Sequence, residues 1–126
     1  MADDKCTVLV VDDEASVRRI IVMMLERSGF GVLVAENGED ALAVYASHKD
    51  EIDVVILDVN MPEMGGEAVY EAIVASDPTL RVVFSSGQDI SALLGRINSK
   101  RVSMVQKPYR LATLISTVRA LVASTV

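Results

Sequence analysis

Two kinds of segment alternate along the chain of 126 residues. Short apolar runs rich in Val and other β-forming residues are separated by longer stretches in which apolar residues recur every three or four positions. Several of the runs are apolar at consecutive positions, which is typical of parallel strands covered on both faces. The runs predict strands at residues 7–11, 31–35, 53–57, 81–85 and 102–106.

The stretches between the runs have the apolar spacing of amphipathic helices. Their apolar stripes fall at residues 17–25, 41–46, 69–74, 93–97 and 111–122. Gly29 stands where the first helix is expected to end, because glycine readily adopts the left-handed conformation that follows many helices. Asp77 and Pro78 are expected to stop the third helix. The fourth stripe is the weakest, since Gly95 inside it lowers helix propensity.

Strand and helix alternate five times, which predicts an α/β fold with a doubly wound parallel sheet. No linker, internal repeat or low-complexity segment divides the sequence, so we expect one domain over residues 1–126, with a core at about residues 7–122. In such sheets the binding site lies outside the carboxyl ends of the strands, near the point where the strand order reverses. The residues that follow the predicted strands are therefore the first candidates for chemistry.

Composition and charge narrow the range of functions. The formal net charge is −6 and the pI about 4.7, so the phosphates of nucleic acids would repel the chain. Cys6 is the only cysteine, which excludes an internal disulfide and a multi-cysteine metal site. Residues 1–5 are acidic rather than apolar, and the longest apolar run, Ile20–Leu25, is far too short to cross a bilayer. We expect a soluble cytoplasmic protein that binds neither membranes nor nucleic acid directly.

Charged and hydroxyl residues stand at the ends of four predicted strands. Asp12 and Asp13 follow the first strand, Asp58 the third, Ser86 the fourth, and Lys107 with Pro108 the fifth. Taken singly, each is better explained by helix capping, a turn, a loop or a solvated lysine. Taken together, the acidic residues close two apolar runs, and adjacent parallel strands lie about 4.8 Å apart. We therefore expect the carboxylates to share one pocket.

This pocket would need positive charge, because three carboxylates so close together cannot all remain ionised without compensation. A divalent cation and the ammonium group of Lys107 would balance them. The candidate ligands offer only oxygen atoms, which favours a hard ion, Mg²⁺ or Mn²⁺. Such a pocket suits phosphoryl transfer, in which positioning and electrostatic stabilisation are the main requirements.

Asp58 is the expected nucleophile, since a carboxylate can attack phosphorus and form an acyl phosphate. Lys107 would neutralise one phosphoryl oxygen, and the Ser86 hydroxyl would donate a hydrogen bond to another. Gly87 is small enough to leave the approach open. An acyl phosphate is reactive, which suits a timed signal better than a permanent modification.

Four motifs, in this order and spacing, resemble the receiver domains of two-component response regulators. They are Val10–Glu14, Leu57–Pro62 with Gly66, Ser85–Gly87 and Gln106–Tyr109. The resemblance extends from Thr7 to about Val122, which is nearly the whole chain. It implies a flavodoxin-like fold, in which five parallel strands in the order 2-1-3-4-5 are covered by five helices.

The resemblance also implies a role for each matching residue around the pocket. Asp58 matches the phosphoacceptor, and Lys107 matches the lysine that binds the phosphoryl group. Asp13 and Asp58 match direct metal ligands. Asn60 would offer its backbone carbonyl to the metal, and Asp12 would act through a water molecule.

Other matching positions concern the response to phosphorylation. Ser86 matches the hydroxyl that turns inward, and Asn60 and Gln88 match positions that tune the hydrolysis of the acyl phosphate. The peptide bond before Pro108 is expected to be cis. Met104 stands where the family has an aromatic switch residue. A swinging ring at this position cannot then be the readout, although a flexible methionine can repack.

The residues together imply a signalling module rather than a conventional enzyme. A histidine kinase or phosphotransfer protein would donate the phosphoryl group, and the phosphorylated domain would change its affinity for a downstream protein or an attached output domain. His48, the only histidine, lies in a polar stretch and is expected in an exposed loop. The donor histidine would therefore belong to another protein or to another part of a longer one. Tyr109 is expected to pack at the start of the last helix.

Three alternative functions fit the sequence less well. A Mg²⁺-dependent phosphohydrolase with Asp58 as nucleophile usually needs a second carboxylate two residues on, where this chain has Asn60, and a cap insertion that is missing here. A degenerate receiver that only docks is disfavoured by the complete pocket. Nucleotide binding on a Rossmann-like sheet is rejected, because the first strand turn, Asp12–Ala15, is acidic where a Gly-rich loop is required.

Overall fold

The computed structural model describes residues 6–125. Residues 1–5, in which the sequence predicts no apolar targeting segment, lie outside the described part, as does residue 126. Strands and helices alternate in the order β1 (Thr7–Val11), α1 (Ala15–Arg27), β2 (Gly31–Ala35), α2 (Gly38–His48), β3 (Val54–Asp58), α3 (Gly66–Val74), β4 (Val82–Ser86), α4 (Ser91–Ile97), β5 (Val102–Gln106) and α5 (Leu111–Ser124).

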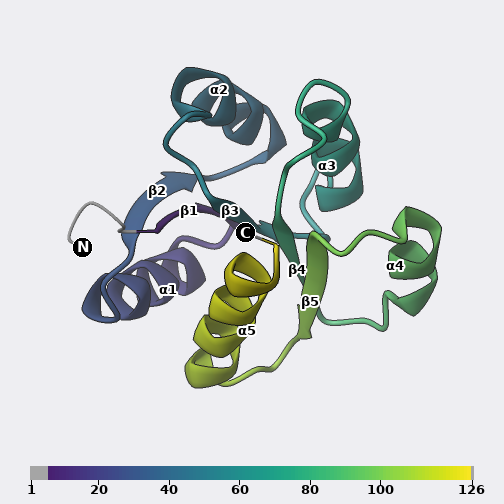
Figure 1. The fold of residues 1–126 in the computed structure, drawn as a ribbon. Helices are drawn as coiled ribbons and strands as arrows, with labels where there is room; N and C mark the ends of the chain where they lie inside the picture. The colour runs from purple at the N-terminus through teal and green to yellow at the C-terminus, as the bar shows by residue number, and fades with distance from the viewer. Residues whose placement is uncertain (1–5, 126) are drawn as a thin grey trace.

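The strands form one parallel sheet in the order β2-β1-β3-β4-β5 (Figure 1). This confirms the predicted α/β class and the flavodoxin-like strand order. From β1 the chain moves to one side of the sheet to form β2, and from β3 onward it moves to the other side. The strand order therefore reverses between β1 and β3, and the carboxyl ends of these two strands flank the place where such a sheet binds ligands.

The two strands β3 and β4 begin and end one residue later than the sequence predicts. The parallel ladder continues far enough to pair Asp58 with Ser85 and Ser86 with Gln106. Asp58 and Ser86 are therefore the last residues of their strands, and the prediction that they follow the strands is wrong by one position. Their backbones are held by the sheet rather than by a loop.

Helices cover both faces of the sheet (Figure 1). The residues of α1 and α5 pack on one face, and those of α2, α3 and α4 pack on the other. Successive residues of a strand point to opposite faces. In β3, Val55 and Leu57 join the core beneath α2, α3 and α4, whereas Val54 and Ile56 join the core beneath α1 and α5.

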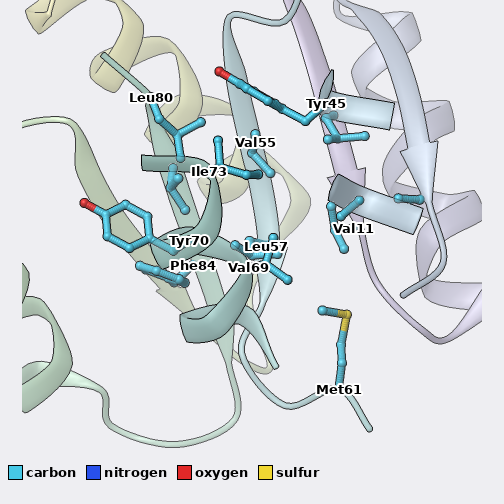
Figure 2. Close-up of a cluster of buried hydrophobic side chains, with 14 of the residues drawn as sticks. Val11, Tyr45, Val55, Leu57, Met61, Val69, Tyr70, Ile73, Leu80 and Phe84 are labelled. Atoms are coloured by element: carbon cyan, nitrogen blue, oxygen red, sulfur yellow. The ribbon is translucent and has the colours of Figure 1, made fainter. Parts of the chain in front are cut away.

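The core is mainly aliphatic, as the composition indicates. Figure 2 shows the part beneath α2 and α3, where Tyr70 packs edge-to-face on Phe84 with 5.7 Å between ring centroids. Every residue of β3 and β4 is buried. Because burial of one large apolar side chain contributes roughly 1.5–3 kcal/mol, these central strands are firmly held. Within residues 6–125, none of the helices combines the length and apolar character that crossing a bilayer requires.

The only histidine of the chain lies far from the carboxyl ends of the strands. His48 is the last residue of α2, so the predicted loop position is wrong. Its Nδ1 lies 2.9 Å from Glu51 Oε2, and 42% of its side chain is exposed. The segment that follows leads into the amino end of β3, at the opposite edge of the sheet from Asp58.

Candidate functional site

Three carboxylates meet at the carboxyl ends of β1 and β3. Asp12 and Asp13 directly follow β1, Asp58 ends β3, and the two strands are hydrogen-bonded neighbours. One carboxylate oxygen from each of the three residues lies within 4.8 Å of the others. Asp12 and Asp58 are only 2% and 3% exposed, whereas Asp13 is exposed. The cluster is thus buried on one side and open to solvent on the other.

Lys107 reaches this cluster from the end of β5. Its Nζ lies 3.6 Å from Asp58 Oδ2 and 3.8 Å from Asp12 Oδ2, and its backbone N–H donates to the Ser86 carbonyl at 2.7 Å. Burial lowers the pKa of Lys107, but the charges of Asp58 and Asp12 outweigh burial and raise that pKa above its ordinary value. The side chain is therefore a cation at neutral pH. The Lys107–Pro108 peptide is cis, as the resemblance implies.

The electrostatic balance at Asp58 is unfavourable to its charge. Burial raises the pKa of Asp58, and the neighbouring charges of Asp12 and Asp13 raise it further. The backbone N–H of Asn60, which donates to Asp58 Oδ1 at 3.1 Å, and the Lys107 ammonium both lower the pKa without reversing the shift. The protein alone thus leaves the cluster with an excess of negative charge, as expected where a cation completes a site.

The loop after β1 is fixed by two contacts. Asp12 Oδ1 accepts a hydrogen bond from the Glu14 backbone N–H at 2.9 Å, and the Asp12 carbonyl accepts one from the Arg18 guanidinium at 2.6 Å. Arg18 lies in the first turns of α1 and was not expected in the site from the sequence. Its place on a helix that follows the acidic pair is the only sequence signal for it, because its contact is with backbone rather than with a charged side chain.

Ser86 and its neighbours form the wall of the site at the end of β4. Ser86 is 1% exposed, and its Oγ accepts a hydrogen bond from the Gln88 backbone N–H at 3.0 Å. Gln88 itself is exposed. A Cβ placed on Gly87 would meet no atom within 4 Å, so the space beside Ser86 is open. In the register of β3 and β4 it is Ser85, not Ser86, that lies directly opposite Asp58.

Two of the other candidates lie around β5, outside the acidic cluster. Met104 is half-buried and packs on the core beneath α2, α3 and α4. Pro108 is exposed on the segment between β5 and α5. Tyr109 packs on the opposite core, beneath α1 and α5, two residues before α5 begins. The expectation that Tyr109 packs near the start of the last helix is confirmed.

The donor set of the cluster fits a hard divalent cation. All three side chains offer carboxylate oxygen, the ligand that Mg²⁺ and Mn²⁺ prefer. The exposed Asp13 gives an ion a path from solvent, while Asp12 and Asp58 provide buried charge. Lys107 contributes a single positive charge against three negative ones, so a divalent cation would complete the neutralisation.

Comparisons with known proteins agree with this geometry. The family model described as "Response regulator receiver domain" matches residues 8–119. The probable transcriptional regulator ycf27 of Guillardia theta is 32% identical over 123 residues, which are 98% of this chain and 48% of that protein. The sensor kinase CckA of Brucella abortus is 32% identical over 114 residues, which are 90% of this chain and 12% of that kinase. The chain thus spans about half of the first protein's length and a small part of the second's.

A solved structure has the same fold. A chain of the CheX–CheY–BeF₃–Mg²⁺ complex from Borrelia burgdorferi matches with a TM-score of 0.85 and 28% sequence identity. The match covers 92% of this chain and 88% of that chain. The likeness thus extends over most of the chain.

Proposed function

The chain belongs to the family of response regulator receiver domains, and we propose that Asp58 is its phosphoacceptor residue. The observation that carries this proposal is the meeting of Asp12, Asp13 and Asp58 within 4.8 Å, with the Lys107 ammonium 3.6 Å from Asp58. A buried carboxylate beside a cation, at the edge where a doubly wound sheet binds ligands, is placed to act as a nucleophile toward phosphorus.

Transfer begins with the attack of an Asp58 carboxylate oxygen on the phosphorus of a phosphohistidine. A new O–P bond forms, the P–N bond to the donor imidazole breaks, and the imidazole leaves. The Asn60 N–H holds Asp58 Oδ1 in place, so the other oxygen, Oδ2, is the attacking atom. Lys107 then lies beside the attacking oxygen and stabilises the negative charge that spreads over the phosphoryl oxygens.

The metal would be Mg²⁺ or Mn²⁺, held by Asp13 and Asp58 directly, by the Asn60 carbonyl and, through water, by Asp12. When bound, it supplies the charge neutralisation that lets two anionic groups approach one another. Ser86 is proposed to donate its hydroxyl to a phosphoryl oxygen after giving up the present contact with Gln88.

The donor is proposed to be a histidine kinase or phosphotransfer protein of the cytoplasm. His48 cannot serve, since it lies at the other edge of the sheet. The recipient of the signal is proposed to be a downstream protein or an attached output domain. Direct nucleic-acid binding by this domain is disfavoured by the net charge of −6. In this role the domain is a signalling phosphoacceptor rather than a conventional enzyme.

Intact-protein mass spectrometry after incubation with Mg²⁺ and acetyl phosphate tests the proposal. We expect a mass gain of one phosphoryl group on the wild type and none on Asp58→Asn. Asp50→Asn, which changes an exposed aspartate in the turn before β3, is the matched control and should be phosphorylated like the wild type. A phosphoryl adduct on Asp58→Asn would reject Asp58 as the acceptor.

The same assay addresses the alternative functions. Sustained turnover of several phosphomonoesters would favour an aspartyl-nucleophile phosphohydrolase. Absence of an adduct, even with a phosphorylated kinase partner present, would favour a degenerate receiver that only docks.

A further inference from the structure

Ser85 is a buried hydroxyl without a hydrogen-bond partner. It is 1% exposed, and among the described residues its Oγ is the buried side-chain polar atom that lacks a partner. Such atoms are rare in folded proteins because leaving one unpaired is costly. In the sheet, Ser85 lies directly opposite Asp58, and the alternation along β4 directs it to the face covered by α1 and α5, where Val83 also points.

The side chain of Tyr109 lies on the same face of the sheet as Ser85 and close to its hydroxyl. The Tyr109 ring packs on the core beneath α1 and α5, and its hydroxyl lies beside Ser85 Oγ without reaching good hydrogen-bond geometry. Burial raises the pKa of Tyr109. The Ser85 hydroxyl and the Lys107 charge lower that pKa, and Asp12 and Asp58 raise it. The Tyr109 hydroxyl is therefore within electrostatic reach of the acidic cluster.

Tyr109 also has space to move. It lines a groove of about 390 Å³ between α1 and the start of α5, together with Val17 and Ile20. It also lines a second groove of about 400 Å³ between β5 and α5, together with Val105 and Thr113. Each is many times the roughly 30 Å³ that one water molecule occupies. Tyr109 thus borders open space in both grooves.

We propose that Ser85 and Tyr109 form a hydroxyl pair that closes when Asp58 is phosphorylated, so that Tyr109 reports the state of the site to the groove between α1 and α5. This inference rests on the proposed phosphorylation of Asp58. Lys107 lies 3.6 and 3.8 Å from the carboxylates, beyond hydrogen-bond distance, and an added phosphoryl group would draw it in. Tyr109 follows Lys107 by two residues and moves with it toward Ser85. The unpartnered Ser85 Oγ then accepts a hydrogen bond from the Tyr109 hydroxyl.

The pair occupies the face of the sheet opposite to Met104. Met104 is the residue that replaces an aromatic side chain at the expected switch position. Tyr109 would supply an aromatic reporter on the other face, connected to Asp58 through Ser85, the residue of β4 that lies opposite Asp58 in the sheet.

Fluorine NMR of protein labelled with 3-fluorotyrosine tests the pair. The chain has three tyrosines, so three signals are expected, and the one absent from Tyr109→Phe is that of Tyr109. With Mg²⁺ and beryllium fluoride as the phosphoryl mimic, we expect the Tyr109 signal to shift more than those of Tyr45 and Tyr70. In Ser85→Ala the shift should be at least halved, and in Ser85→Thr, which keeps the hydroxyl, it should return. Ser85→Ala removes an unpartnered group and should fold like the wild type.

The fluorine spectrum separates the two levels of the proposal. A signal of protein-bound beryllium fluoride that is absent from Asp58→Asn reports the site itself. If this signal appears while the Tyr109 signal stays in place, or shifts equally in Ser85→Ala, the hydroxyl pair is overturned and the phosphoacceptor remains. If no bound signal appears in the wild type, the proposed function fails first.

Discussion

At the scale of single residues, the fold holds Asp58 in a place where its negative charge is unfavourable. Asp58 is fixed by a buried strand, so it cannot turn toward water to reduce its unfavourable charge. A group that destabilises the resting protein but serves its chemistry is common in functional sites. The instability is measurable, because removal of the charge should stabilise the protein.

Asp58→Asn is expected to raise the free energy of unfolding of the metal-free protein near neutral pH by about 1 kcal/mol. The pKa of Asp58 is raised in the folded state, so the ionised form opposes folding at pH values above that pKa. The penalty disappears as the pH falls through the folded-state pKa toward the ordinary value of 3.8, where both states bind the proton. Urea denaturation of both proteins across this range measures the difference. A variant less stable than the wild type at neutral pH would contradict the argument.

The sequence identified the acidic residues and the lysine because they share a position at strand ends. It could not identify Arg18, which contacts only the backbone oxygen of Asp12, or the unpaired Ser85, whose isolation depends on how the ring of Tyr109 packs. Contacts of these two kinds depend on side-chain placement rather than on a pattern along the chain.

At the scale of elements, the connection from β3 to α3 is limited by close backbone approach. A Cβ placed on Gly66, the first residue of α3, would lie 2.6 Å from the Asp58 carbonyl oxygen and 3.0 Å from the Val59 Cα. Both are backbone atoms at the end of β3 or directly after it, so they cannot move without displacing Asp58. The glycine is therefore required by geometry.

Gly66→Ala is expected to destabilise the protein by about 2 kcal/mol and to slow phosphorylation by acetyl phosphate, because relief of the clash shifts the end of β3. Gly95→Ala is the matched control: Gly95 is exposed inside α4, and an added Cβ meets nothing within 4 Å. That change should stabilise the protein by about 0.5–1 kcal/mol through helix propensity and leave phosphorylation unchanged. Thermal unfolding and intact mass report the two effects. Equal effects of the two substitutions would show that the close contact is unimportant.

A hydrogen bond outside the acidic cluster allows the stability of the fold to be tested separately from phosphorylation. The Tyr45 hydroxyl on α2 donates a hydrogen bond to Asp77 in the turn after α3. Hydrogen bonds from Thr79 and Tyr45 lower the pKa of Asp77, so their stabilisation is present above the ordinary pKa of 3.8 and is lost as the pH falls through the folded-state value. Tyr45→Phe should therefore cost about 1 kcal/mol near neutral pH and less in acid.

Denaturation curves measure this cost, and Tyr70→Phe is the comparison, because the described residues offer its hydroxyl no hydrogen bond. Both variants should be phosphorylated like the wild type. A loss of phosphorylation in Tyr45→Phe would show that the contact between α2 and α3 matters to the site.

The order and type of all ten elements could be predicted from the sequence, since β3 and β4 begin with consecutive apolar residues and the helices carry apolar stripes. The ends of β3 and β4 could not be predicted, because the polar residues Asp58 and Ser86 interrupt the apolar pattern while the pairing between the strands continues through them. Strand order came from the resemblance, because periodicity alone does not state which strands are neighbours. His48 was misplaced because a polar helix end has the same composition as a loop.

At the scale of the whole molecule, net charge and metal binding affect stability together. A chain with a net charge of −6 repels itself, so any salt will stabilise it to some extent by screening. A cation bound at Asp12, Asp13 and Asp58 would add a specific effect, because it binds the folded chain, in which these residues meet, and not the unfolded chain. The two effects differ in their dependence on pH.

Addition of Mg²⁺ at a hundredfold excess over its Kd should raise stability by about 2.7 kcal/mol when ionic strength is matched with NaCl. Protons compete with the metal for Asp58, whose pKa is raised, so the gain should fall as the pH decreases through that pKa. Simple screening would show no such decline centred on one carboxylate. Asp58→Asn should gain much less from Mg²⁺, and Asp50→Asn should gain as much as the wild type. Thermal unfolding with paired Mg²⁺ and NaCl samples decides the matter: an equal gain in Asp58→Asn and wild type would mean that the cation acts on total charge and not at the acidic cluster.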